Sequence, residues 1–144
     1  MSKPKFLLDV NVLVALADED HVHHDSVLKW FRATGKQNWG VCAFTEAGFL
    51  RVSTRPRTGG RSMREAVELL TRLIALPGFH YWPISVAWST LAAPFERRVF
   101  GHQQITDAYL LGLAVRENGV LVTLDKAMEH LAGREYRHHL LVLE

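Results

Sequence analysis

Two apolar segments of this chain each end in an aspartate that leads directly into a segment of helix-forming composition. The first is FLLD, residues 6–9, and the second is VLVTLD, residues 120–125. Short apolar runs that alternate with helices are typical of parallel strands covered on both faces. An ionised carboxylate left unpartnered in apolar surroundings costs several kcal/mol. We therefore expect Asp9 and Asp125 to lie where a strand ends and the chain turns, with Asp9 exposed.

The rest of the chain continues this alternation, which predicts an α/β fold. The predicted strands cover residues 5–9, 39–43, 79–84, 120–125 and 139–144. The predicted helices cover residues 11–19, 21–34, 44–54, 62–76, 105–118 and 126–133, with a further short helix broken at Pro94.

Local signals indicate where several of these helices begin and end. Ser62 and Glu65 have the spacing of a capping box, which predicts the start of the helix over residues 62–76. Pro56 should end the helix over 44–54, because the residue before a proline disfavours helical geometry. Gly119 is expected to end the apolar helix over 105–118.

The composition indicates one globular domain over residues 1–144. The chain is 48% hydrophobic and 22% charged, and no repeat or linker-like stretch divides its 144 residues. The single cysteine, Cys42, excludes an internal disulfide and suits a reducing cytosol. The N-terminal MSKPKF leads into an apolar run interrupted by Asp9, so we expect a cytoplasmic protein with no signal peptide and no membrane span.

Four acidic residues are expected to converge on one edge of the sheet. Asp9 and Asp125 follow strands, Asp107 begins the apolar helix over 105–118, and Glu46 lies near the start of the helix after the second strand. Each acid taken alone could be a helix cap or a first-turn acid that favours the helix dipole. Four converging negative charges need a cation, and an all-oxygen site suits Mg²⁺ or Mn²⁺.

Four segments in order, LLDVNVLVAL, FTEAGFLRV, ITDAYLLGLA and LVTLDKAM, resemble the motifs of PIN-domain ribonucleases of the VapC type, the toxins of bacterial toxin–antitoxin pairs. The resemblance spans nearly the whole chain. It implies a three-layer fold, with a mainly parallel central sheet flanked by helices. It also implies a Mg²⁺-dependent endoribonuclease, with Mn²⁺ as an alternative metal, that hydrolyses RNA without a covalent intermediate. The residues that match the family's functional positions are Asp9, Glu46, Asp107 and Asp125, with Asn11 and Thr106 as polar helpers.

Within this set, we expect Asp9 and Asp107 to bind the metal directly. Glu46 and Asp125 would orient water or complete a second metal position. Val10 stands where many members of the family have a small polar residue, which leaves the support of Asp9 open. The resemblance further implies an RNA substrate and a small antitoxin as partner, and exposed apolar surface would support a homodimer.

Arginines are dense after the second motif. Phosphate contacts from such residues would give RNA affinity that does not depend on base sequence and falls with salt. The alternative is an ordinary solvated loop. The residues expected to bind RNA are Arg51, Arg55, Arg57 and Arg61.

Two other functions fit parts of the sequence. A PIN-like domain could keep the fold as a non-catalytic interaction module. A phosphatase-like enzyme could use Asp9 as an aspartyl nucleophile after the first strand. Such enzymes usually carry a second aspartate two positions further on, where this chain has Asn11.

Overall fold

Five parallel strands form one sheet in the part of the chain that the structure, a computed structural model, describes: residues 4–144. Their order across the sheet is β3-β2-β1-β4-β5. Every predicted strand is present, shorter than expected, and every pairing is parallel. The strands are β1 (Phe6–Leu8), β2 (Trp39–Val41), β3 (Phe79–Tyr81), β4 (Val120–Thr123) and β5 (Leu140–Val142).

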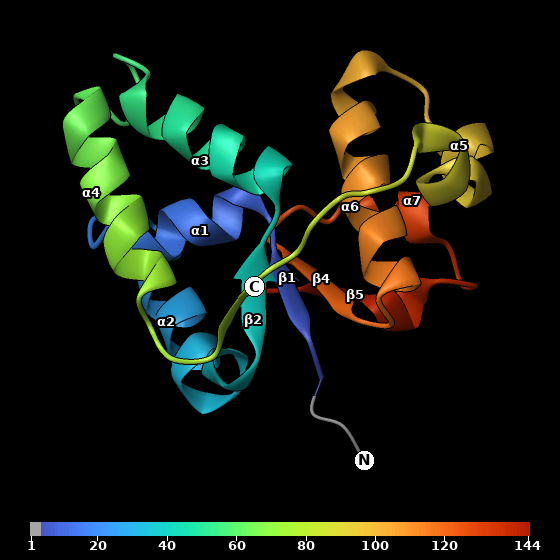
Figure 1. The fold of residues 1–144 in the computed structure, drawn as a ribbon, viewed down its shortest axis with the longest axis horizontal. Coiled ribbons are helices and arrows are strands. Elements are labelled where there is room, and N and C mark those ends of the chain that lie inside the picture. Colours follow the sequence, from blue (N-terminus) through green and yellow to red (C-terminus); the bar gives the residue numbers. More distant parts are fainter. Residues whose placement is uncertain (1–3) are drawn as a thin grey trace.

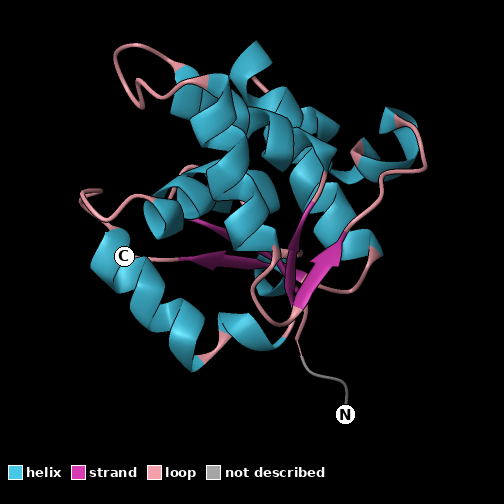
Figure 2. Cartoon of the chain, turned by 60° about the vertical axis from the view of Figure 1, so that its left-hand side comes forward, coloured by secondary structure: helices cyan, strands magenta, loops and turns pink. Residues whose placement is uncertain are grey.

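Helices cover both faces of this sheet and complete the expected three layers (Figures 1 and 2). One layer contains α1 (Val10–Ala17), α2 (His24–Ala33), α3 (Ala43–Thr54) and α4 (Met63–Ile74). The other contains α5 (Trp88–Leu91), α6 (Ile105–Arg116) and α7 (Met128–Ala132). No helix among the described residues is long and apolar enough to cross a bilayer.

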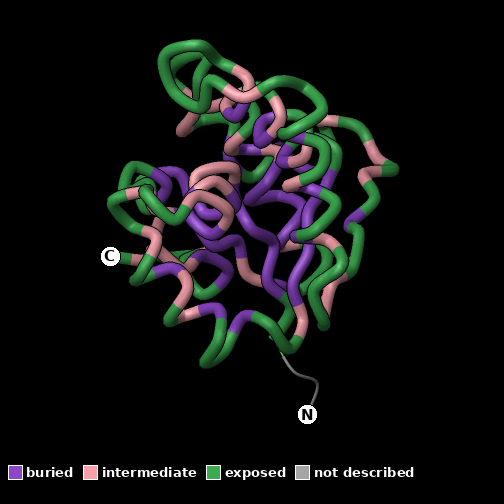
Figure 3. The backbone as a smooth tube through the Cα atoms, turned by 90° about the vertical axis from the view of Figure 1, so that its left-hand side faces the viewer, coloured by how far each residue is buried: buried purple, intermediate pink, exposed green. Residues whose placement is uncertain are grey.

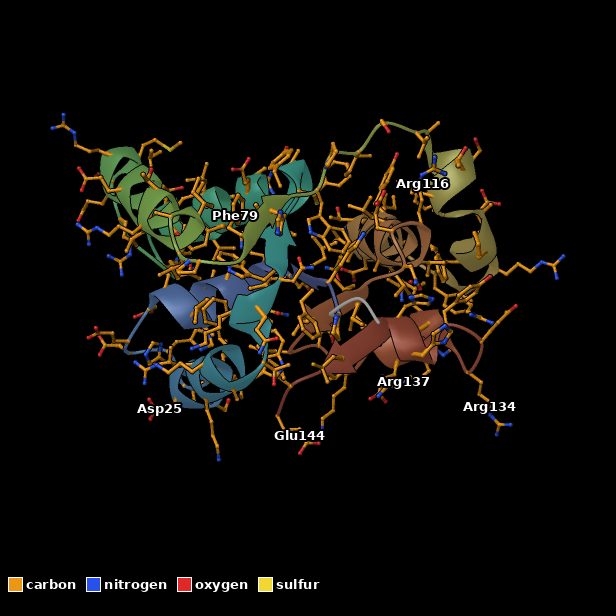
Figure 4. All side chains as sticks on the ribbon, turned by 60° about the horizontal axis from the view of Figure 1, so that its bottom comes forward. Asp25, Phe79, Arg116, Arg134, Arg137 and Glu144 are labelled. Atoms are coloured by element: carbon orange, nitrogen blue, oxygen red, sulfur yellow. The ribbon has the colours of Figure 1, made fainter. Side chains whose placement is uncertain are left out.

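Alternating residues of the strands belong to two hydrophobic cores, one on each face of the sheet. Phe6 and Leu8 of β1 pack with α1 to α4, whereas Leu7 packs with α6 and α7 on the opposite face. Figure 3 shows the buried backbone concentrated in the sheet and the inward sides of the helices. Charged side chains such as Asp25 and Arg134 extend outward from the surface (Figure 4). This division explains why β1 is apolar throughout, since both of its faces are covered.

The helix ends follow most of the predicted signals. The Ser62 hydroxyl accepts the Glu65 N–H at 3.1 Å, and the Glu65 carboxylate accepts the Ser62 N–H at 2.9 Å, which confirms the capping box. The stop predicted at Gly119 is wrong by one residue. Asn118 takes the left-handed conformation, with φ of 53°. The Gly119 N–H then donates to the Ala114 carbonyl at 2.7 Å, as in a Schellman motif.

The strand order creates a crevice at the carboxyl ends of β1 and β4. From β1 the chain builds the sheet in one direction through β2 and β3, and later in the other direction through β4 and β5. At such a switch point the loops leave on opposite faces, and ligands bind there in open parallel sheets. Residues 1–3, which begin the segment expected to lack a signal peptide, lie outside the described residues.

Candidate active site

Asp9 follows β1 directly and caps the N-terminus of α1, but it is buried rather than exposed as predicted. Only 8% of its surface is accessible. Its Oδ1 accepts the Val10 N–H at 2.7 Å, and its Oδ2 accepts the hydroxyl of Thr123 at 2.8 Å. The prediction failed because β4 lies beside β1 and covers the carboxylate. The cost of burial is offset by these two hydrogen bonds rather than by water.

Thr123, the last residue of β4, lies at the centre of this hydrogen-bond network, although it was not predicted from the sequence. Besides donating to Asp9, its Oγ1 accepts the amide Nδ2 of Asn11 at 3.3 Å and the backbone N–H of Asp125 at 3.1 Å. Asn11 in turn accepts the Leu124 N–H at 3.1 Å. Thr123 therefore joins the loop after β1 to the loop after β4. A lone hydroxyl in an apolar strand, two residues before an acid, is the signal that could have identified it.

Three of the four predicted acids line one cleft of about 440 Å³ at this crevice: Asp9, Asp107 and Asp125. Asp107 lies half-buried in the first turn of α6. Asp125 is exposed, and its Oδ1 accepts the Ala127 N–H at 2.9 Å, which fixes the turn after β4. Helix capping alone would not require carboxylates from three separate elements to line the same cleft.

Two carboxylates of this cleft, those of Asp9 and Asp107, have a pKa above the ordinary value for aspartate. Burial raises the pKa of Asp9, and the nearby charge of Asp125 raises it further, against the lowering effect of its hydrogen bonds to Thr123 and Val10. Burial raises the pKa of Asp107 to about 7, with added repulsion from Asp9 and Asp125. Among residues 4–144, no basic side chain forms an ion pair with these carboxylates, and a bound cation would favour their ionised form.

The donor set fits a magnesium ion held by two carboxylates. Within residues 4–144, no three histidine, cysteine, aspartate or glutamate side chains stand together as a ready-made metal-binding group. Mg²⁺ commonly binds through one or two carboxylates and completes its coordination with water and substrate phosphates. Asp9 and Asp107 line the same cleft, and the charge of Asp9 contributes to the raised pKa of Asp107, so these two carboxylates are the candidate pair.

The structure does not bring Glu46 to this cleft. The α3 residues that line the cleft include Phe44, Gly48 and Arg51, and Glu46 lies on a different side of the helix. It is half-buried and lies toward β3, where burial and then the Glu46 charge raise the pKa of Tyr81. Gly48 also permits the close approach of α1, since a Cβ at this position would collide with Cγ2 of Val10.

The remaining predicted residues are divided between the cleft and its surroundings. Thr106 is exposed and lines the cleft beside Asp107. Arg51 and Arg55 line the side of the cleft formed by α3. Arg61 lines a separate pocket of about 230 Å³ between α1 and α3, and Arg57 is exposed in the turn that follows α3.

The family model described as PIN domain matches residues 6–134, which is most of the chain. The chain belongs to the PIN domain family. It is 40% identical over 128 residues to Ribonuclease VapC38 of Mycobacterium tuberculosis, covering 88% of this chain and 89% of that protein. It is 38% identical over 123 residues to Ribonuclease VapC44 of the same species, covering 85% of this chain and 87% of that protein.

Solved structures support the same PIN domain fold. The crystal structure of VapBC2 from Rickettsia felis, bound to a DNA fragment from their promoter, aligns with a TM-score of 0.65 and 15% sequence identity. The alignment covers 96% of this chain and 98% of that one. The residues matched by the PIN domain model include all three carboxylates of the cleft and Thr123.

Proposed function

We propose that this PIN domain is a metal-dependent endoribonuclease and the toxin of a VapBC-type toxin–antitoxin pair. The observation that carries the proposal is the cleft in which Asp9, Asp107 and Asp125 face the arginines Arg51 and Arg55. Anionic carboxylates suit a divalent cation, and the arginines suit the phosphates of RNA. Identity of 38–40% to relatives named Ribonuclease VapC supports the same activity. We also propose that residues 1–144 form a single nuclease domain.

In this proposal, Asp9 and Asp107 hold one Mg²⁺, for which Mn²⁺ can substitute. When bound, the metal would lower the pKa of water and stabilise the charge that develops on the phosphate. Thr123 holds the Asp9 carboxylate in place, because its hydroxyl donates to Oδ2 at 2.8 Å. Asp125 is exposed beside them and is available to orient the attacking water. Arg51 and Arg55 bind the phosphates that flank the scissile bond.

The direct test is cleavage of RNA by the purified protein. We expect cleavage of single-stranded RNA in Mg²⁺ or Mn²⁺ and complete loss of cleavage in excess EDTA. The proposed mechanism needs the positive charge of the metal to activate water and to stabilise the phosphate. Gel separation of end-labelled fragments measures the products. Activity should return when Mg²⁺ is added back beyond the chelator. Cleavage that continues undiminished in EDTA would exclude the metal mechanism.

The partner proposed for this chain is a small antitoxin. An unregulated ribonuclease would harm its own cell, and the structurally similar VapBC2 is a complex of two components. A lysine or arginine from the partner can enter the cleft and neutralise Asp9 and Asp107 in place of the metal. We further propose that the protein acts in the cytoplasm and forms a homodimer through exposed apolar side chains such as Met63 and Val67.

Expression of the chain alone should therefore arrest bacterial growth. Co-expression of the product of a small neighbouring gene should restore growth, and the two proteins should purify together. The matched control is Asp107→Asn, which should be harmless with or without the partner because it lacks activity. Normal growth on expression of the active chain alone would contradict the toxin proposal.

A further inference from the structure

A second hollow adjoins the carboxylates on the side opposite the arginines. It has a volume of about 590 Å³ and shares Asp107 and Asp125 with the cleft. Its apolar floor is formed by Met128 and Leu131, and its rim includes Phe100. The cleft and this hollow together form a continuous path across the carboxylates, from the arginines of α3 to the segment that precedes α6.

Phe100 is the most unusual residue on this path, because 78% of its surface is exposed. Burial of such a ring against another apolar surface would be favourable, and the isolated chain leaves it exposed. The ring lies tilted against His130, with centroids 5.7 Å apart. The Phe100 N–H donates to Oε1 of Gln104 at 2.6 Å, and the Gln104 N–H donates to the Gly101 carbonyl at 3.0 Å. These hydrogen bonds close the turn and fix the backbone from which the ring projects.

We propose that Phe100 is a stacking platform for a nucleobase of single-stranded RNA, next to the phosphate that is cleaved. This proposal rests on the proposed ribonuclease function and adds a substrate-binding residue to it. Aromatic side chains bind unpaired bases through their flat faces, whatever the base. The hollow is large enough for a base, and its Met128 and Leu131 floor offers apolar contact. With phosphates on Arg51 and Arg55 and a base on Phe100, the intervening phosphate lies over the carboxylates.

The test measures the affinity of a short single-stranded RNA in the Asp107→Asn background, where cleavage does not interfere. Phe100→Ala should weaken binding by about 5- to 150-fold, the range found for loss of one stacked base. Phe100→Trp should keep the affinity, because it keeps a stacking face. Leu76→Ala removes an apolar side chain that is 38% exposed after α4 and lines neither the cleft nor the hollow, and it should leave the affinity unchanged. Fluorescence anisotropy of a labelled oligonucleotide measures each constant.

Salt dependence separates stacking from charge. Phe100→Ala should lower the affinity equally at every salt concentration, because the ring displaces no counterions. Arg51→Ala should also weaken binding, but it should reduce the slope of log affinity against log salt by about 1. An equal affinity for Phe100→Ala and its parent, no gain from Trp over Ala, or no binding of RNA to the parent would each overturn the proposal. Absence of RNA cleavage by the wild type would instead refute the ribonuclease function, which distinguishes the two failures.

Other occupants of the Phe100 surface give different results. If the ring were a dimer contact, Phe100→Ala would change the sedimentation of the protein and leave its RNA affinity intact. If it were a contact for a partner protein, the substitution would weaken only that complex. Either result would overturn the stacking role.

Discussion

Asp107→Asn is expected to lower RNA cleavage on the order of 1000-fold or more, while the metal-free protein stays at least as stable as the wild type. The loss reflects the several kcal/mol that a bound metal contributes to the transition state, with each 1.36 kcal/mol worth tenfold in rate. Stability should hold or rise because the substitution removes one of three repelling carboxylates. Initial rates of RNA cleavage and thermal melts in EDTA measure the two effects.

Asp107 is a cleaner position for this test than Asp9. Asparagine caps a helix about as well as aspartate, so the sequence alone suggests that either aspartate could be replaced without structural cost. In the structure, however, Oδ2 of Asp9 accepts the Thr123 hydroxyl. An asparagine amide group in that place would point N–H donors at an oxygen that already accepts two. Asp9→Asn should therefore destabilise the protein as well as inactivate it.

The same substitution predicts a change in the pH dependence of stability. The pKa of Asp107 is about 7 in the folded metal-free protein, against an ordinary value of 3.8. The folded state therefore binds more protons than the unfolded chain between these values, and the free energy of unfolding falls as pH rises through that range. Above about pH 7 this contribution is fully lost. In Asp107→Asn, the free energy of unfolding should fall less steeply as pH rises. Urea unfolding in EDTA at several pH values measures this.

Mg²⁺ should restore the free energy of unfolding that the wild type loses as pH rises, because an ion that binds only the folded state stabilises that state. The gain from metal at neutral pH should be smaller in Asp107→Asn. The matched control is Asp25→Asn, which removes an exposed aspartate from α2, outside the cleft. It should change neither the activity nor the response to metal. Wild-type turnover by Asp107→Asn would show that the metal site is assigned wrongly.

Thr123→Val is expected to lower the free energy of unfolding by about 2–3 kcal/mol and to lower cleavage by about 10- to 100-fold. Valine has the same shape as threonine but offers no hydroxyl. Asp9 would lose the donor on Oδ2, and Asn11 and the Asp125 N–H would lose their acceptor. The protein would lose stability because these polar groups lose their hydrogen-bond partner. It would lose activity because the carboxylate of Asp9, the proposed metal ligand, would be free to rotate.

Two further variants make this result interpretable. Thr123→Ser keeps the hydroxyl and should recover most of the activity. Thr71→Val removes an exposed hydroxyl that donates only to the Val67 carbonyl of its own helix. The free energy of unfolding should therefore change by no more than about 0.5 kcal/mol. Equal activity of Thr123→Val and the wild type would show that Asp9 needs no support from β4.

The sequence was sufficient to predict the layers because the signals involved are local. Apolar runs followed by amphipathic helices indicate parallel strands, and the Ser62 capping box needs only its own turn. The burial of Asp9 could not be predicted in the same way. It depends on β4 lying beside β1, and strand order is decided by packing between segments more than 100 residues apart.

The position of Glu46 shows a different limit. Its place near the start of α3 suggested convergence with the other acids, yet the phase of the helix decides which side it faces. The α3 residues that reach the cleft, among them Phe44, Gly48 and Arg51, recur at intervals of three and four. Glu46 lies two residues from both Phe44 and Gly48, and so about half a turn away. The sequence shows which residues share a face of this helix, but it does not show which face lines the cleft.

The dependence of Asp9 on β4 also has a consequence for synthesis of the protein. Asp9 is made first, but the hydroxyl that fixes it belongs to Thr123, and Asp107 and Asp125 are likewise made well after Asp9. A growing polypeptide that has completed α1 to α4 can cover one face of a partial sheet, but it contains neither Asp107 nor Asp125. For a ribonuclease this order matters, because the ribosome and its message are themselves RNA. Under the ribonuclease proposal, a nascent chain therefore cannot complete its carboxylate site before residue 125 has been made.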